Sequence, residues 1–325
     1  MLVVVCPGQG AQSPGMLTPW LELPTVTESI ARASRTTGLD LLAHGTTSDA
    51  DTIRDTAVAQ PLLVATALAS LRAVLDLGPD DALDIAAQRV VGATAGHSVG
   101  ELAAAAIAGV LTDDEALRLV AVRGAAMARA AATTPTGMCA VLGGDPDEVL
   151  AALTEHGLVP ANVNGGGQVV AAGTLDALAA FAAAPPARAR VVALQVAGAF
   201  HTEHMAPAVA ELRAAADDVT PGEPMVPLLT NSDGTVAASG ARALELIVAQ
   251  VANPVRWDLC QSTLQSLGVT GVLEVAPGGV LTGLARRTLP GVETVAVKTP
   301  ADLDAARDLV RRHTGTPESH QEKSS

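Results

Sequence analysis

The feature that most constrains this chain is a tight turn between an apolar segment and an alanine-rich one. The turn reads Gly96-His97-Ser98-Val99-Gly100, which fits the pattern G-x-S-x-G. Small residues around the serine permit a sharp strand-to-helix turn that exposes the hydroxyl. At that position the N–H groups and dipole of the following helix stabilise negative charge. The turn therefore predicts an α/β fold with a nucleophilic serine, Ser98.

The segments around the turn extend the α/β pattern. Leu2–Cys6 is a β-branched run ending at Pro7-Gly8, and Arg89–Ala95 leads into the turn, so both are expected to be buried strands. Helices are expected over Ala57–Leu77 and Glu101–Val110. A further helix should start after Thr112, which is followed by three acids, and should carry Arg123.

The middle of the chain has a different pattern. It predicts strand, helix, two strands joined by glycines, helix and strand, which is the β-α-β-β-α-β order of ferredoxin-like domains. We therefore expect a small ferredoxin-like domain over residues 128–198, inserted into a large hydrolase-like α/β domain formed by residues 1–127 and 199–313. Further strands are expected at Val226–Asn231, Gly271–Val275 and Thr294–Val297, and the polar residues 314–325 are expected to be a disordered tail.

Composition excludes several classes of protein. The formal net charge of −14 argues against general nucleic-acid binding, which needs a positive field. The N-terminus lacks the charged and long apolar regions of a signal peptide, and no apolar run of membrane-spanning length is free of polar interruption. Cys6, Cys139 and Cys260 lie in apolar surroundings without metal-like spacing. These observations predict a soluble, cytoplasmic protein with reduced thiols and no metal site.

A nucleophilic serine needs a base, and the chain has seven histidines. His97 adjoins Ser98 but should point away from it in such a turn. Four others lie among polar or terminal residues and are expected at the surface: His44, His156, His313 and His320. His201 and His204 remain, in the segment Ala199-Phe200-His201-Thr202-Glu203-His204. His201 closely follows the last predicted strand of the small domain, where a cleft between domains is expected. His201 is therefore favoured as the base over His204.

Several short motifs occur together in a specific order and spacing. They are Pro7-Gly8-Gln9-Gly10-Ala11-Gln12, Gln60-Pro61, Gly96–Glu101, Val122-Arg123-Gly124, Ala199-Phe200-His201-Thr202 and Asn253-Pro254-Val255. Together they resemble the malonyl-CoA:acyl-carrier-protein transacylases, the discrete acyltransferases of fatty acid and type II polyketide synthesis. The resemblance extends from Leu2 to about Pro300, and the acyltransferase domains of multidomain synthases are also similar.

The resemblance implies a ping-pong reaction in which a malonyl group passes from malonyl-CoA to Ser98 and then to the phosphopantetheine thiol of an acyl carrier protein. His201 would be the base, oriented by the backbone carbonyl of Gln250 in place of a carboxylate. The backbone N–H groups of Gln9 and Val99 would form the oxyanion hole. Gln60 and Phe200 would line the acyl pocket, and Asn162 and Asn164 would lie near the pantetheine arm.

Arg123 is the residue that separates this family from serine esterases. On the sequence pattern alone it is a solvated arginine on an amphipathic helix, beside Arg118 and Arg129. The resemblance instead assigns it to the free carboxylate of the malonyl group, which a planar guanidinium can hold through two parallel hydrogen bonds. Phe200 before His201 and Val99 after Ser98 are the residues of the malonyl type, and a phenyl ring there leaves little room for a methyl branch.

The resemblance implies no permanently bound cofactor, with malonyl-CoA as a substrate, and it implies a monomer. An acidic carrier protein would need a basic patch on this acidic chain, and Arg256, Arg286 and Arg287 are candidates. Three alternatives stay open. They are a serine thioesterase or other hydrolase, a transferase for a different acyl-CoA, and a non-catalytic interaction module.

Overall fold

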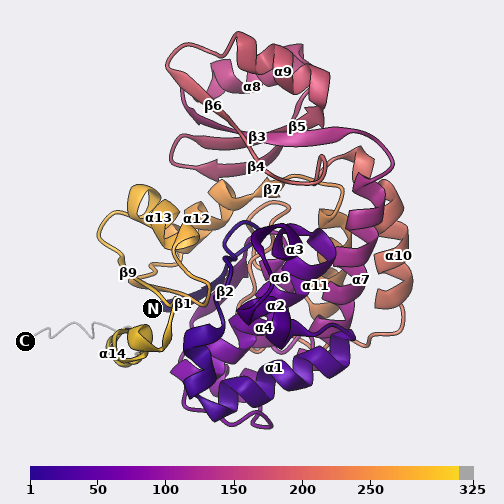
Figure 1. The fold of residues 1–325 in the computed structure, drawn as a ribbon. Coiled ribbons are helices and arrows are strands. Elements are labelled where there is room, and N and C mark those ends of the chain that lie inside the picture. Colours follow the sequence, from indigo (N-terminus) through magenta and orange to yellow (C-terminus); the bar gives the residue numbers. More distant parts are fainter. Residues whose placement is uncertain (315–325) are drawn as a thin grey trace, which may run out of the picture.

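The computed structural model describes residues 1–314, which form two sheets and the helices around them (Figure 1). Of the tail expected over residues 314–325, residues 315–325 lie outside the described part. The two sheets differ in strand direction and in the way they are covered, and the Ser98 turn lies between them.

The first sheet is parallel, with the strand order β2-β1-β8-β9. In a parallel sheet the carboxyl ends of all strands meet at one edge, and here β1 and β2 end together, with Cys6 beside Gly96. The loop after β1 and the Ser98 turn after β2 are therefore neighbours. The strands are β1 (Leu2–Cys6), β2 (Ala93–Gly96), β8 (Gly271–Glu274) and β9 (Glu293–Ala296).

Two expected strands differ from the structure. The strand expected from Arg89 begins only at Ala93, because Val90 and Val91 donate backbone hydrogen bonds to Ala87 at the end of the preceding helix. The strand expected at Val226–Asn231 is wrong. This segment makes two isolated bridges and no ladder. One is parallel, between Leu228 and Thr94 of β2, and the other is antiparallel, between Leu229 and Val236. From Thr230 the chain turns through side-chain bonds to Ser232 and Asp233.

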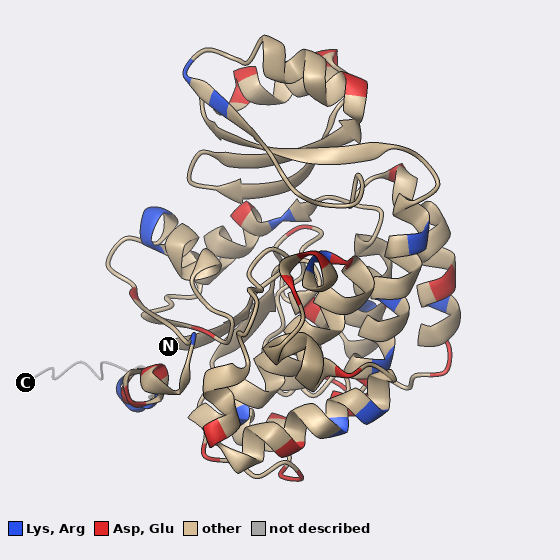
Figure 2. Cartoon of the chain, viewed as in Figure 1, with Lys and Arg blue, Asp and Glu red and all other residues tan. Residues whose placement is uncertain are grey.

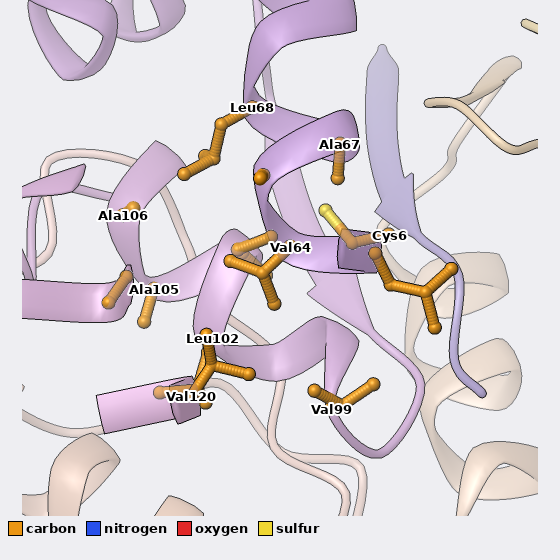
Figure 3. Close-up of a cluster of buried hydrophobic side chains, with 14 of the residues drawn as sticks. Cys6, Val64, Ala67, Leu68, Val99, Leu102, Ala105, Ala106 and Val120 are labelled. Atoms are coloured by element: carbon orange, nitrogen blue, oxygen red, sulfur yellow. The ribbon is translucent and has the colours of Figure 1, made fainter. Parts of the chain in front are cut away.

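Three helices pack against the parallel sheet and one another around a core of small and branched side chains. The core cluster in Figure 3 joins Cys6 of β1 to Val64 of α4, Leu102 of α6 and Val120 of α7. Thr112 and Glu115 form the capping box that begins α7, which confirms the expected start of that helix. Helix α4 is long and apolar enough to cross a membrane but is buried within the protein. The three helices are α4 (Thr56–Val74), α6 (Gly100–Ile107) and α7 (Asp113–Ala131).

The other helices cover the outside of this part and connect its strands. They are α1 (Pro24–Thr37), α2 (Leu41–Thr46), α3 (Ala50–Arg54), α5 (Leu83–Gln88), α10 (Ala206–Ala216), α11 (Gly240–Gln250), α12 (Trp257–Ser266), α13 (Val280–Thr288) and α14 (Leu303–His313). Short 3₁₀ helices occur at Thr18–Glu22, Glu203–Met205 and Pro300–Asp302.

The second sheet contains the expected β-α-β-β-α-β order, in the spatial order β6-β3-β5-β4-β7. Helices α8 and α9 cover its outer face, where Leu153 and Phe181 are buried against Val141 (Figure 1). The sequence did not predict β7, which pairs in parallel with β4 and belongs to the C-terminal part of the chain. The elements are β3 (Thr136–Gly143), α8 (Pro146–Glu155), β4 (Val159–Gly165), β5 (Gln168–Thr174), α9 (Leu175–Ala183), β6 (Ala189–Ala193) and β7 (Val255–Arg256).

The domain boundary expected between residues 127 and 128 falls in the last turn of α7, which continues to Ala131. Because β7 extends the small sheet, a segment of the expected large domain contributes backbone to the expected small one. The small sheet, which lies across the cavity from Ser98, is therefore made from two distant parts of the chain.

Candidate active site

The Ser98 turn has the geometry of a nucleophile elbow. Ser98 follows β2, precedes α6 and has a positive φ of 52°, a conformation that costs a residue other than glycine strain. A Cβ on Gly96 would lie 1.9 Å from the carbonyl carbon of Gly100. The turn can therefore close only with glycine at that position, and it leaves Ser98 partly exposed.

Ser98 and His201 are brought together. Ser98 Oγ lies 2.8 Å from His201 Nε2, and His201 Nδ1 lies 2.8 Å from the carbonyl oxygen of Gln250. Because a carbonyl only accepts, the Nδ1 nitrogen carries the proton and Nε2 is left to accept from the serine hydroxyl. Among the recorded contacts of residues 1–314, His204 makes none with Ser98. The side chain of Gln250 donates to Ser98 O rather than to the imidazole.

Burial, and secondarily the charge of Arg123, lowers the pKa of His201 to about 3. The imidazole is therefore neutral at physiological pH, which is the state in which it can take a proton. His201 also has a positive φ, 62°, so both members of the pair are held in a backbone conformation that the surrounding structure must enforce.

Arg123 is buried and reaches the Ser98 hydroxyl, so the solvated arginine of the sequence pattern is wrong. Its Nη1 donates to Gln60 Oε1 (2.6 Å), and its Nη2 donates to Gln250 Oε1 (3.0 Å) and to Ser98 Oγ (3.2 Å). Burial lowers the pKa of Arg123 to about 10, against the opposing charge of Glu101. The guanidinium therefore stays charged at neutral pH, beside the serine hydroxyl.

A cavity of about 80 Å³ opens between these groups and the small sheet. This volume is far below the roughly 300–1,000 Å³ of pockets for drug-sized ligands, so the cavity fits a short acyl group and not a long chain. Its lining contains polar and apolar residues in equal number. The polar residues are Gln9, Gln60, His97, Ser98, Asn162 and His201, and the apolar ones are Met127, Met138, Val170, Leu194, Val196 and Phe200.

The backbone around Ser98 offers two hydrogen-bond donors. Within residues 1–314, neither the Gln9 N–H nor the Val99 N–H is recorded with an acceptor, whereas the Ser98 N–H donates to Asn231 Oδ1 (2.8 Å). A Cβ on Gly8 would lie 2.8 Å from the His97 carbonyl oxygen, so a glycine there brings the first loop against the elbow. The Val99 side chain does not line the cavity and packs in the core instead (Figure 3).

The two asparagines expected near the pantetheine arm occupy different environments. Asn162 lines the cavity, and its buried Oδ1 has no hydrogen-bond partner among the described residues. Asn164 does not line the cavity. Its Oδ1 lies 2.8 Å from Nε2 of His97, which does. The His97 ring also packs edge-on against Trp257 at 5.6 Å. His97 therefore points away from Ser98, as expected, and joins the elbow to β4.

Two buried polar residues at this site were missed by sequence reasoning. Glu101 follows the elbow in α6 and Asn231 follows the Leu228 bridge, and both are almost completely buried. Burial raises the pKa of Glu101 to about 8, although hydrogen bonds from Asn231 and Gln250 and the charge of Arg123 oppose the shift. An acid in an otherwise apolar, alanine-rich helix was a usable signal for Glu101, whereas nothing in the sequence pattern marked Asn231.

The three arginines considered as a basic patch are not equivalent. Arg256 forms two hydrogen bonds with Asp258, which offsets its charge. Arg286 and Arg287 lie in the last turn of α13 and have no recorded ion pair within residues 1–314. A Cβ on Gly166, in the turn between β4 and β5, would lie 3.2 Å from Arg287 Nε. Figure 2 shows this basic end of α13 below the small sheet.

Comparison with known proteins places the chain in a family. The model of the acyl transferase domain matches residues 3–312. A malonyl CoA-acyl carrier protein transacylase of Mycobacterium tuberculosis is 52% identical over 95% of this chain and its own full length. The corresponding enzyme of Escherichia coli is 33% identical over 94% of this chain and 98% of its own.

Solved structures agree. The crystal structure of MCAT from Mycobacterium tuberculosis superposes with a TM-score of 0.88 at 50% identity, covering 94% of this chain and 99% of that one. A malonyl-transacylase in complex with a type II PKS acyl-carrier protein has a TM-score of 0.84 at 32% identity, covering 94% and 99% of the two chains. The predicted fold, a hydrolase-like α/β part with a ferredoxin-like subdomain, is thereby confirmed. On sequence and structure together, the chain belongs to the acyl transferase family.

Proposed function

We propose that the protein transfers a malonyl group from malonyl-CoA to the phosphopantetheine thiol of an acyl carrier protein, through a malonyl-Ser98 intermediate. The relatives that match it over nearly its whole length are malonyl CoA-acyl carrier protein transacylases. The observation that carries the proposal is the position of Arg123, a buried cation 3.2 Å from the Ser98 hydroxyl. An esterase for neutral acyl groups has no use for a charge there.

In the first half-reaction Ser98 Oγ attacks the thioester carbonyl carbon while His201 Nε2 takes the hydroxyl proton. The carbonyl oxygen gains negative charge, and the N–H groups of Gln9 and Val99, which have no recorded acceptor, would stabilise it. The tetrahedral intermediate then collapses, the C–S bond breaks, and the imidazolium returns its proton to the leaving CoA sulfur. Malonyl-Ser98 and free CoA are the products.

In the second half-reaction the carrier protein's thiol replaces CoA. His201 takes the thiol proton, the thiolate attacks the ester carbonyl, and Ser98 leaves with the proton from the imidazolium. A carbonyl oxygen, that of Gln250, stands behind His201 where serine hydrolases often have a carboxylate. A thiol needs less help than water to lose its proton, because its pKa is about 8–9, so this weaker support suits transfer to a thiol.

Selection for malonyl rests on charge and size. Arg123 can hold the terminal carboxylate and, with Gln60 beside it, orient the thioester towards Ser98. The pairing would supply about 2–5 kcal/mol of discrimination against uncharged acyl groups. Phe200 lines the small cavity, where a methyl branch on the substrate would be disfavoured by about 1–3 kcal/mol.

The pantetheine arm and the carrier protein would enter from the small-sheet side. The Asn162 Oδ1, which has no partner within residues 1–314, would accept from an amide N–H of the pantetheine. Asn164 would act indirectly, by holding His97. Arg286 and Arg287 at the end of α13 would meet the acidic surface of the carrier. We further propose that the enzyme acts as a monomer in the cytoplasm.

A transfer assay tests this function. The protein is incubated with malonyl-CoA and a phosphopantetheinylated acyl carrier protein, and malonyl-carrier, free malonate and CoA are quantified. We expect CoA release to match malonyl-carrier formation. Free malonate as the only acyl product would instead identify a thioesterase. A panel including acetyl-CoA and methylmalonyl-CoA identifies a transferase for another acyl group if one of these is the better substrate.

A further inference from the structure

The Ser98 elbow is held by an amide side chain from a distant part of the chain. We infer that Asn231 is a positioning residue, which fixes the backbone of Ser98 so that its hydroxyl faces His201 and its own N–H is withheld from the oxyanion. The inference deepens the proposed function, because it names a residue on which formation of the acyl-enzyme depends without contact with the substrate.

Asn231 binds the elbow on both sides of His97. Its Oδ1 accepts from the Ser98 N–H (2.8 Å), and its Nδ2 donates to the Gly96 carbonyl oxygen (2.8 Å). A backbone N–H only donates and a backbone carbonyl only accepts, so this amide fits in one orientation alone. One side chain therefore satisfies the two polar groups that the turn removes from the sheet.

The location of Asn231 follows from the sheet. Thr94 of β2 donates to Pro227 and accepts from Leu229, so the segment before Asn231 lies beside β2 in a parallel register. Its carboxyl end therefore arrives at the same edge as the elbow. Beyond Leu229 the chain forms no further ladder with β2 and turns away. The Asn231 side chain takes the place of the next backbone pairing.

Asn231 is itself fixed by the groups that hold the rest of the site. Its backbone N–H donates to Glu101 Oε1 (2.6 Å), and its carbonyl accepts from the Arg256 N–H (2.8 Å). Gln250 Nε2 donates to Asn231 Oδ1 (3.0 Å), to the Ser98 carbonyl (3.1 Å) and to Glu101 Oε2. Both backbone polar groups of Ser98 are thus bound to side-chain amides. Glu101 accepts from the side-chain amide of Gln250 and from the backbone N–H of Asn231.

This arrangement explains how the strained Ser98 conformation is maintained. The residue has a positive φ, and such a conformation persists only where its surroundings over-determine it. Without the Asn231 amide, the buried Gly96 carbonyl and Ser98 N–H would lack their partners and the turn could relax. The hydroxyl would then move relative to His201 and to the donors at Gln9 and Val99.

The test measures acylation of Ser98 directly in the full-length protein. Rapid-quench experiments with malonyl-CoA and acetyl-CoA give the acylation rate constant and half-saturation concentration for wild type and Asn231→Ala. A small misplacement of reacting groups costs up to about 100-fold in rate, so we expect the rate constant to fall by about 10- to 100-fold for both substrates. The half-saturation concentration should stay within about threefold of the wild-type value, because the substrate contacts are intact. The ratio of the malonyl to the acetyl rate constant should stay within about twofold of the wild-type ratio.

Controls separate positioning from stability. Ser70→Ala removes a buried hydrogen bond from the Ala276 N–H, in which neither the elbow nor the Asn231 contacts take part, so it should lower the melting temperature and leave the acylation rate constant unchanged. Glu101→Gln is a second variant in case Asn231→Ala does not fold. In this variant an NH₂ group stands where Glu101 Oε2 accepts from Gln250 Nε2, so two donors face each other. Acylation by both malonyl-CoA and acetyl-CoA should therefore slow.

Two outcomes overturn the inference. One is an unchanged acylation rate constant in folded Asn231→Ala or, where that variant does not fold, in Glu101→Gln. The other is a change in the half-saturation concentration alone, or a slower acylation by malonyl-CoA with no change for acetyl-CoA. If wild type itself forms no acyl-Ser98, the proposed function fails rather than this inference.

Discussion

The two sheets contribute different kinds of groups to one cavity. The parallel sheet and its helices supply Ser98, after β2, and Gln60 on α4, and Arg123 of α7 donates hydrogen bonds to both from behind the lining. The small sheet, whose strands β3 to β6 pair antiparallel, supplies mostly apolar residues, including Met138 and Val170, with Asn162 as its polar member. The chemistry is therefore fixed by the parallel part, whereas the small sheet covers it and shapes access.

This division has a structural reason. The carboxyl ends of parallel strands bring loops from distant parts of the chain to one edge, and an elbow there gains a helix N-terminus at the same time. An antiparallel sheet with helices on one face presents its other face as a smooth surface. Substitutions on the parallel side should therefore change the reaction itself, and substitutions on the small sheet should change substrate binding.

Ser98→Ala should give the largest effect, because it removes the atom on which the proposed acyl intermediate forms. Transfer is expected to fall by at least about 10,000-fold, while the melting temperature stays near that of wild type since Ser98 is partly exposed. Intact-mass measurement after incubation with malonyl-CoA checks for the adduct. A variant that still acquired one malonyl group on the same peptide would remove Ser98 from its role.

Arg123→Ala tests the charged member of the parallel side. Loss of a pairing of about 2–5 kcal/mol should lower the malonyl-to-acetyl selectivity by about 100-fold, mainly through malonyl-CoA. Competition between the two acyl-CoAs, read as kcat/KM, gives the ratio. Arg118→Ala, an exposed arginine on the same helix, is the matched control and should keep the wild-type ratio. Equal ratios in both variants would exclude a carboxylate clamp at Arg123.

The pH dependence tests the environment of the base. The pKa of His201 is lowered to about 3, by burial first and by the charge of Arg123 second. The neutral, active imidazole should then persist as pH falls, and be lost only as pH approaches that value. For acylation by malonyl-CoA, kcat/KM reports the free enzyme. It should change by less than about threefold between pH 7.5 and 5, whereas a base with the ordinary pKa of about 6.5 would lose more than tenfold. A midpoint near 6.5 would contradict the buried, neutral base.

Asn162→Leu tests the small sheet and should have the smallest effect. Loss of one hydrogen bond of about 1 kcal/mol should raise KM for malonyl-CoA and for the carrier protein by about fivefold, with kcat unchanged. Folding should be little affected, because Asn162 Oδ1 has no partner among the described residues. Asn162→Ser keeps an uncharged acceptor at this place and is the matched control. A fall in kcat without a change in KM would place Asn162 in the chemistry and break the division between the two sheets.

Much of the fold was predictable because it depends on local pattern. The run Leu2–Cys6 and the capped start of α7 occur where propensity and capping predict them. The strand order β-α-β-β-α-β also follows from the sequence. The failures depend on tertiary contacts. Val226–Asn231 has the composition of a strand but pairs at only one point with β2, and β7 is two residues long and exists only because β4 lies beside it.

In the candidate site, too, the residues within local motifs were predictable and those that depend on tertiary contacts were not. Ser98 and His201 lie within short motifs, and the structure brings their side chains together at 2.8 Å. The burial of Arg123 was not readable from a helix with other arginines on it, because it depends on Gln60 and Gln250 from two other helices. Asn231 could not be found at all, since its role comes from the place where a loop ends beside the elbow.

The most direct measurement is a chase of the acyl-enzyme. Wild-type protein is quenched after a brief exposure to malonyl-CoA, digested and mapped by mass spectrometry, before and after addition of phosphopantetheinylated acyl carrier protein. We predict a malonyl group on the peptide containing Ser98, lost on addition of the carrier as an equal amount of malonyl-carrier appears. An adduct on another residue, or a malonyl-Ser98 that the carrier does not discharge, would contradict transfer through this serine.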